Sequence, residues 1–285
     1  MQKFKRISAF LLCAVILLSS FATLGVSADE YDFPAGATSV NVRLDGKKVL
    51  EGEAVIINSV TYVPLRRFAE LMGADKISWN AKTNTATVTK GTLEVHVGSG
   101  ALYVGANGRY FFTVEKILNI SDRLFVPVRP IAKAFSANVD WDNSTRTVVI
   151  TSTGKTLASA DAFYNSTDLY WLSRIIQAEA GGESITGMIA VGNVVLNRKA
   201  SKQYPNTVYG VIFDRNGGTQ FSPVSMGTIY NNPSERSIIA AKICLEGYSI
   251  DNNILFFMNP RIATSNWISK NRPFAFTIGR HDFYY

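Results

Sequence analysis

Glu179 is a carboxylate whose position in the sequence suggests chemistry. It falls on the apolar face of a predicted helix, whose members at helical spacing are Leu172, Ile175, Ile176 and Glu179. A glutamate is seldom buried unless it is paired or has a functional role. The alternative is a carboxylate at the edge of the helix that reaches water. The pattern therefore marks Glu179 as a candidate functional group.

The residues after Glu179 indicate how its carboxylate would be tuned. Gly181 and Gly182 predict the end of the helix, because glycine is a poor helix former and suits a left-handed C-terminal cap. In the last turn, the negative end of the helix dipole and apolar burial would both raise the pKa of Glu179. A carboxylic acid that stays protonated near neutral pH can protonate the leaving oxygen of a glycosidic bond.

Gln220, Phe221 and Ser222 form a second group of candidates, for substrate binding. An amide and a hydroxyl can pair with an N-acetyl group, while an aromatic ring can cover the apolar CH groups of a sugar. The alternative is a turn that leads into Pro223.

Three further residues are candidates for contacting substrate. Glu183 is the carboxylate nearest to Glu179 in sequence, although the glycine pair breaks the helical phase between them. Trp267 could line a groove, with a place in the core as the alternative. His281 could also contact substrate, and its alternative is a structural hydrogen bond to the backbone.

Helices must position these residues in the last third of the chain. The pattern predicts helices over residues 169–180, 185–200 and 233–245, with aromatic, strand-like pieces between and after them. The sequence thus predicts an α+β domain over residues 169–285, preceded by a polar linker over residues 154–168.

The middle of the chain contains an internal repeat. Residues 61–70 reappear as 124–133, and residues 77–88 reappear as 139–150. The matched pairs are Pro64 with Pro127, Arg66 with Arg129, and Trp79 with Trp141. Each unit begins with a hairpin signal, at Asp45-Gly46 and at Asn107-Gly108. We expect strands, a short helix and then a tryptophan-bearing strand in each repeat.

Residues 1–28 have the features of a secretory signal peptide. The segment begins with basic residues and continues with an apolar run over residues 10–18. It ends with a cleavage site of the A-x-A type at residues 26–28. We expect cleavage after Ala28 and no permanent membrane anchor, since the apolar run is short. A retained anchor is the alternative.

Composition restricts the classes of partner and cofactor. The chain has 29 basic and 22 acidic residues, so removal of the three basic residues in the predicted signal peptide leaves 26 and a net charge of +4. This mild excess suits a polyanionic surface, while scattered basic residues and export argue against nucleic acid. Only Cys244 remains after cleavage, which precludes an internal disulfide, and we expect no metal and no cofactor.

The repeats resemble the stalk-like repeat of bacterial surface proteins that is named after the N-terminal domain of copper amine oxidase. The motif VPLR followed by a tryptophan strand carries the resemblance, over about residues 40–153. It implies a β-rich α+β stalk domain, which we place at residues 29–153. Two interpretations of this domain remain open. It is either a wall-docking module that binds anionic cell-wall polymers or a scaffold without a binding role. Copper is not implied, because the chain has only two histidines.

The C-terminal domain resembles the catalytic domain of spore-cortex-lytic enzymes, the cell wall hydrolase family with a lysozyme-like fold. Six motifs occur in order between residues 169 and 285: QAEAGGE, AVGNVVLNR, TQFSPV, FFMNP, SNW and IGRHDFY. The resemblance implies a secreted or cell-wall-associated enzyme that cleaves peptidoglycan glycan strands, in vegetative wall or spore cortex. Its catalytic glutamate, the first in AEA-x-GE, falls on Glu179.

A single acid fits a lytic transglycosylase, which forms a 1,6-anhydro product and needs no second carboxylate. A muramidase-type hydrolase is the alternative, and would need a partner carboxylate roughly 5 to 9.5 Å away. The candidates for that partner are Glu183, Asp214, Glu235, Asp251 and Asp282. A non-catalytic wall-binding protein is a further alternative. An exported amidase or peptidase is less favoured, since two histidines and one apolar cysteine supply neither zinc ligands nor a nucleophile.

Overall fold

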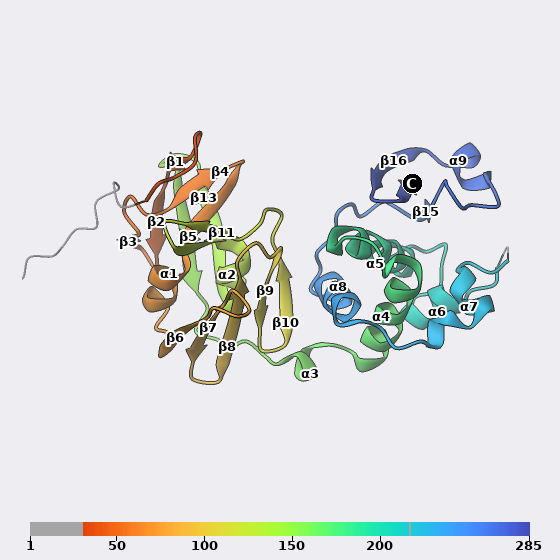
Figure 1. Cartoon of the computed structure of the whole chain (residues 1–285), viewed down its shortest axis with the longest axis horizontal. Helices are drawn as coiled ribbons and strands as arrows, with labels where there is room; N and C mark the ends of the chain where they lie inside the picture. Colours follow the sequence, from red (N-terminus) through yellow and green to blue (C-terminus); the bar gives the residue numbers. More distant parts are fainter. Residues whose placement is uncertain (1–30, 217) are drawn as a thin grey trace, which may run out of the picture.

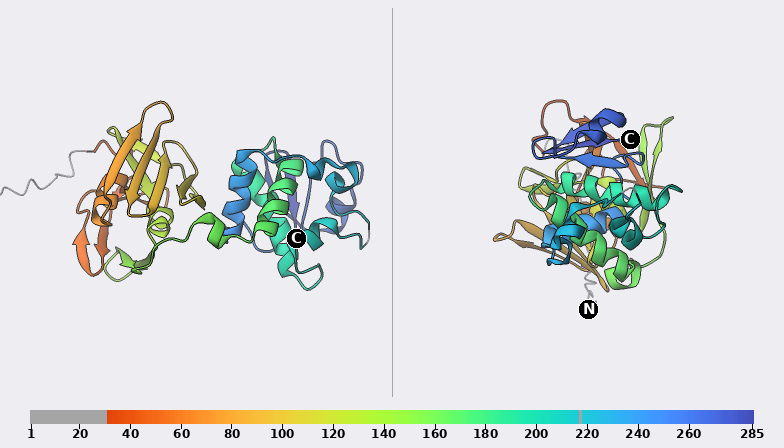
Figure 2. Two further views of the ribbon diagram at one scale, coloured as in Figure 1. Left: turned by 90° about the horizontal axis from the view of Figure 1, so that it is seen from below. Right: turned by 90° about the vertical axis from the view of Figure 1, so that its right-hand side faces the viewer.

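A computed structural model describes residues 31–216 and 218–285 of the chain. Figures 1 and 2 show a β-rich domain followed by a mainly helical one, which confirms the predicted α+β class. The predicted signal peptide, residues 1–28, lies outside the described residues. None of the helices within the described residues is long and apolar enough to cross a membrane.

The two repeats of the N-terminal domain share a central five-stranded sheet. Its strands, in order across the sheet, are β1 (Thr38–Ser39), β4 (Val55–Ile57), β5 (Val60–Pro64), β12 (Arg123–Pro127) and β11 (Leu118–Ile120). The repeated motif lies on β5 and β12, which pair antiparallel with Val63 opposite Val126. The two copies of the motif therefore stabilise one another directly.

Two further sheets complete the N-terminal domain. The first has the order β10 (Arg109–Phe112), β9 (Tyr103–Ala106), β8 (Leu93–Gly98), β7 (Thr85–Lys90) and β6 (Lys76–Asn80). The second has the order β13 (Ala137–Asp142), β14 (Thr147–Ser152), β2 (Asn41–Leu44) and β3 (Lys47–Val49). Because β14 pairs parallel to β2, the first hairpin of the domain completes the sheet formed by its last strands.

Both predicted hairpin turns are present. Asp45 and Gly46 have φ angles of 49° and 81°, and Asn107 and Gly108 have φ angles of 48° and 73°. Positive φ at both central residues is the geometry that favours Asn-Gly and Asp-Gly in two-residue hairpins. Two short helices, α1 (Leu65–Leu71) and α2 (Val128–Ala134), begin directly after the prolines of the repeated motif.

The C-terminal domain packs helices against a small sheet. Its helices are α4 (Ser166–Ala180), α5 (Ile185–Ala200), α6 (Val208–Phe213), α7 (Ser222–Met226), a 3-10 helix (Thr228–Tyr230), α8 (Glu235–Leu245) and α9 (Trp267–Asn271). The sheet has the order β15 (Phe256–Met258), β17 (His281–Tyr284) and β16 (Phe274–Ile278). Helix α5 is its centre: a Cβ at Gly192 would lie 2.7 Å from the Cys244 Sγ and 2.9 Å from Ile176. Glycine thus permits the close approach of α5 to α4 and α8.

The helix that carries Glu179 starts three residues earlier than predicted, at Ser166. The Asn165 side chain accepts a hydrogen bond from the Asp168 N–H and caps the helix. The segment predicted as a linker also contains a helix, α3 (Ala160–Phe163), whose Ala160 N–H donates to the carbonyl of Asn107. This segment is therefore packed against the N-terminal domain.

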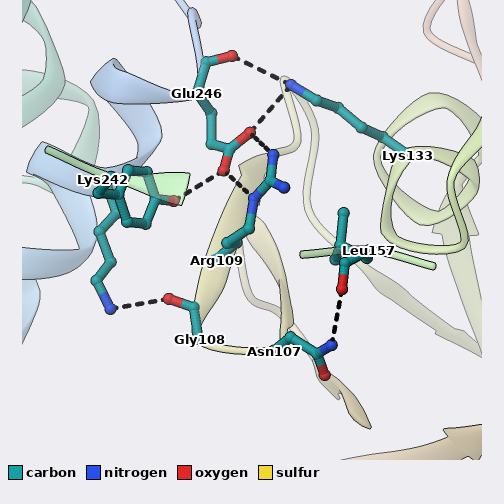
Figure 3. A network of polar contacts seen from close by, with 8 residues as sticks. Asn107, Gly108, Arg109, Lys133, Leu157, Lys242 and Glu246 are labelled. Carbon is teal, nitrogen blue, oxygen red and sulfur yellow. Dashed lines mark hydrogen bonds and ion pairs between the residues drawn. The ribbon is translucent and has the colours of Figure 1, made fainter. Parts of the chain in front are cut away.

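The two domains meet around the buried carboxylate of Glu246, whose side chain is 2% exposed (Figure 3). Arg109 donates to both oxygens of this carboxylate, at 2.7 and 2.9 Å, and the Tyr164 hydroxyl donates to one of them at 2.8 Å. Lys133 lies 3.3 Å from the same carboxylate. A bidentate, buried arginine–carboxylate pair is geometrically specific, so it fixes how the domains join.

Candidate active site

Helix α4 places Glu179 as the sequence predicts. Leu172, Ile175 and Ile176 are fully buried in the core of the C-terminal domain. Glu179 continues this face in the last turn of the helix and remains partly exposed. The carboxylate therefore lies where the apolar core meets solvent.

The predicted left-handed cap at the end of α4 is wrong. Gly181 closes the helix with φ −58° and ψ −24°, which is a right-handed conformation. Its N–H donates to the carbonyl of Gln177, and a Cβ at Gly181 would overlap the Gln177 side-chain amide. The glycine is needed for space in a tight turn, after which Ser184 caps α5 by accepting from the Gly187 N–H.

Burial raises the pKa of Glu179 to about 7. Loss of hydration is the cause, since the charged form is disfavoured at the edge of the core. Within residues 31–216 and 218–285, the carboxylate has no hydrogen bond or ion pair. Near neutral pH the group is thus divided between its acid and its base form.

Glu183 is bound to the β16–β17 turn. Its carboxylate accepts from the Arg280 N–H at 3.3 Å and lies 3.6 Å from the Arg280 Nε. The side chain is buried against Gly279, where a Cβ would overlap the Glu183 Oε2. These contacts hold the turn between α4 and α5 against the sheet, so they give Glu183 a structural role.

Phe221 differs from its predicted role as an exposed sugar-binding face. It is 3% exposed, because the ring packs in the core beside Phe257. The side-chain amide nitrogen of Gln220 donates to the carbonyls of Asn216 and Gly218, which leaves Ser222 as the exposed member of the group. The segment is therefore a packed loop that presents a hydroxyl.

His281 and Trp267 both lie against β15. His281 contacts Phe257, and Trp267 contacts Phe256. The ring of His281 is 5.5 Å from that of Phe257, and burial lowers the pKa of His281. Trp267 is 50% exposed, with its ring 6.5 Å from that of Phe256. Trp267 is therefore the predicted aromatic residue that offers a face to solvent.

Arg198 is a residue that the sequence reasoning missed. It is 5% exposed, donates to the carbonyl of Leu255 at 2.7 Å and lies over the rings of Phe221 and Phe256. The signal was an arginine at the end of the apolar run AVGNVVLNR, where a buried cation needs partners. Arg198 connects the Gln220–Ser222 loop to the small sheet.

Three of the other candidate carboxylates have local partners, and the fourth, Glu235, is exposed on α8. Asp251 accepts from the Tyr285 hydroxyl and Asp282 from the Thr277 hydroxyl, while Asp214 accepts from the N–H of Asn216. No charged group contributes to the pKa of Glu179 in the part of the chain that the structure describes. Among these candidates, Glu179 is therefore the unpaired carboxylate whose pKa is raised by burial.

Comparisons with known proteins match both halves of the chain. Residues 182–284 match the family described as Cell Wall Hydrolase, and residues 43–150 match the Copper amine oxidase N-terminal domain. Glu179 lies three residues before the first of these ranges.

Curated relatives and a solved structure share the C-terminal region. A spore cortex-lytic enzyme of Bacillus cereus is 38% identical over 120 residues, which are 42% of this chain and 45% of the relative. That of Bacillus subtilis is 36% identical over 120 residues, 42% of this chain and 38% of the relative. The chain thus spans less than half the length of these relatives. The catalytic domain of the germination-specific lytic transglycosylase SleB from Bacillus anthracis is 37% identical, with coverage of 43% of this chain and 97% of that domain and a TM-score of 0.39.

These matches confirm both resemblances that the motifs carry. The C-terminal part of the chain belongs to the cell wall hydrolase family and follows a copper amine oxidase N-terminal domain.

Proposed function

We propose that this protein cleaves the glycan strands of peptidoglycan between N-acetylmuramic acid and N-acetylglucosamine, as a lytic transglycosylase. The single observation that carries the proposal is Glu179, an unpaired carboxylate whose pKa burial raises to about 7. The names of the relatives, spore cortex-lytic enzymes and a lytic transglycosylase, support the same substrate class.

Glu179 would act twice in this reaction. As an acid it donates its proton to the glycosidic oxygen, so that the bond from that oxygen to C1 of the muramic sugar breaks. As a carboxylate it then takes the proton of the 6-hydroxyl, whose oxygen bonds to C1 and closes the 1,6-anhydro ring. A pKa of about 7 suits both steps, because neither protonation state is far from populated at neutral pH.

The muramidase alternative requires a second carboxylate at a defined distance. A retaining enzyme would place it about 5 Å from the first, where two like charges perturb each other strongly. The pKa of Glu179 carries no such contribution among the described residues, and Glu183 is engaged by Arg280. These observations favour the transglycosylase.

The site of action follows from the same proposal. A secreted or wall-associated enzyme is supported by the signal-peptide features of residues 1–28, with cleavage after Ala28. The glycan strands of vegetative wall or spore cortex would then be its partner.

Mass spectrometry of the muropeptides released from purified peptidoglycan tests the proposal. The protein from residue 29 to residue 285 should release 1,6-anhydro ends, and Glu179→Gln should lower this release roughly 100-fold or more because it removes the acid. Asp161→Asn, at an exposed position on α3, is the control and should retain activity. Reducing muramic ends would instead establish a muramidase, and full activity of Glu179→Gln would remove the basis of the proposal.

A further inference from the structure

A groove of about 580 Å³ lies in the N-terminal domain, away from Glu179. It is formed by α1, by β6 and by the hairpin of β11 and β12. Half of its lining residues are apolar or aromatic, among them Trp79, and the polar half includes Arg66 and Asn119. The volume is within the range of about 300 to 1,000 Å³ that is usual for small-molecule and cofactor sites.

The second repeat serves as an internal reference for this groove. There, the Trp141 indole N–H donates to the Asn143 side chain at 3.4 Å. The sequence match places Ala81 where the second repeat has Asn143, so the first repeat lacks this acceptor. In the described residues the Trp79 N–H has no hydrogen-bond partner, and its side chain is 50% exposed.

The arginine of the repeated motif shows the same difference. Arg129 in the second repeat donates to the carbonyl of Val139 at 2.7 Å, across the gap between α2 and β13. Arg66 occupies the matching position in the first repeat, but has no hydrogen bond or ion pair within residues 31–216 and 218–285. Two groups that are satisfied internally in one repeat are therefore available to a ligand in the other.

The charges around the groove leave a positive balance. Glu53 is buried, accepts from the Tyr31 hydroxyl and pairs with Arg67 at 3.5 Å. The lining carries three arginines and two carboxylates, but Arg67 is also neutralised by Glu70 at 3.2 Å, so the positive charge that remains is that of Arg66. A ligand with carboxylate groups would thus be favoured over a cationic one.

We propose that this groove is a second, non-catalytic binding site for an N-acetylated, carboxylate-bearing glycan. The indole face of Trp79 would cover the apolar face of a sugar ring, as aromatic rings do when one side stays wet. Arg66 would bind a carboxylate or an N-acetyl carbonyl, and Asn119 can serve both donors and acceptors. The choice of peptidoglycan as this glycan rests on the proposed function.

Such a site would act by multivalency. When the N-terminal domain is bound to the polymer, the catalytic domain of the same chain stays close to glycan. The effective concentration of glycan at the catalytic domain is then higher than in free solution. Cleavage of intact peptidoglycan would gain from this effect, while cleavage of a short soluble fragment would not.

Hydroxyl-radical footprinting of the Glu179→Gln protein, residues 29–285, tests the proposal residue by residue. Peptide-free glycan strands are the probe, and mass spectrometry measures the oxidation rate of each tryptophan. We expect Trp79 to be protected roughly tenfold, as stacking that covers an exposed indole would give. Trp141 is the matched control: it is 39% exposed and should keep its rate.

Arg66→Gln should reduce the protection of Trp79 at the same glycan concentration, whereas Arg129→Gln should not. Equal protection of both tryptophans, or none at Trp79, would overturn the proposal. Protection by poly(glycerol phosphate) without protection by glycan would also overturn it, in favour of docking to a polyanion. The readout does not depend on bond cleavage, so a protein that fails the muropeptide test can still pass this one.

Discussion

Replacement of Glu179 by glutamine should stabilise the protein at alkaline pH. In the folded protein the ionised carboxylate is disfavoured by burial, and nothing charged in the described residues compensates it. Glutamine has the shape of the protonated acid and stays neutral at every pH. The substitution therefore removes a cost that the wild-type protein bears only when Glu179 is ionised.

The sign and size of the effect follow from the two pKa values. The folded-state pKa of Glu179 is about 7, whereas the ordinary pKa of a glutamate side chain in water is 4.5. Between these values the folded protein holds a proton that the unfolded chain has lost, so the free energy of unfolding falls as pH rises through this window. At about 1.4 kcal/mol for each pKa unit, the loss is about 3 kcal/mol and is complete above about pH 8. This is an upper value, because Glu179 is partly exposed.

Urea unfolding at about pH 4 and about pH 8.5 measures the difference. Far-ultraviolet circular dichroism reports mainly the helices of the C-terminal domain. The titration of all other groups affects both proteins equally, so it does not contribute to the difference between them. The free energy of unfolding of Glu179→Gln, relative to that of the wild type, should increase by about 3 kcal/mol between these pH values. Glu235→Gln, at an exposed position on α8, is the control and should show no such growth. A difference that is constant with pH would refute the raised pKa, and with it the argument for an acid at Glu179.

Two further predictions concern the packing that holds the site and its domain in place. Arg109→Ala should lower the free energy of unfolding by about 3 kcal/mol, because Glu246 would remain buried without its bidentate partner; calorimetric unfolding measures this loss, and an unchanged transition would contradict it. Gly279→Ala should cost about 1 to 3 kcal/mol, since a Cβ there would overlap the Glu183 carboxylate at a φ of 61°. Thermal unfolding measures this cost, with Gly182→Ala as the control because no atom lies within 4 Å of the new Cβ there. An equal loss of stability in the two variants would contradict the prediction.

Features that depend on local spacing were predictable from the sequence. The apolar face of α4 is visible as a period in the sequence, and the structure confirms that Leu172, Ile175 and Ile176 are buried. The hairpin at Asn107-Gly108 was predictable because its residue types are those that accept positive φ. In each case the information lies within a few neighbouring residues.

Features that depend on contacts between distant segments were not predictable. Phe221 is predicted to cover a sugar, but its ring is buried beside Phe257 of β15 and under Arg198. The partner of Glu246 is Arg109, which is 137 residues away in sequence. A pattern in one segment carries no information on which distant segment will cover it.

The parallel pairing of β2 with β14 has a mechanical consequence. Tension that enters the N-terminal domain through β2 and leaves it through β14 would pull the two strands in opposite directions along their length. The hydrogen bonds between β2 and β14 would then be loaded in shear. They extend from the Thr147–Asn41 pair to the Ile150–Leu44 pair, and under shear they resist together instead of opening one at a time. Forced unfolding is governed by the rate of the first rupture, and a sheared pair makes that rupture slow. A domain with this arrangement can bear load that acts between the segment before β2 and the segment after β14.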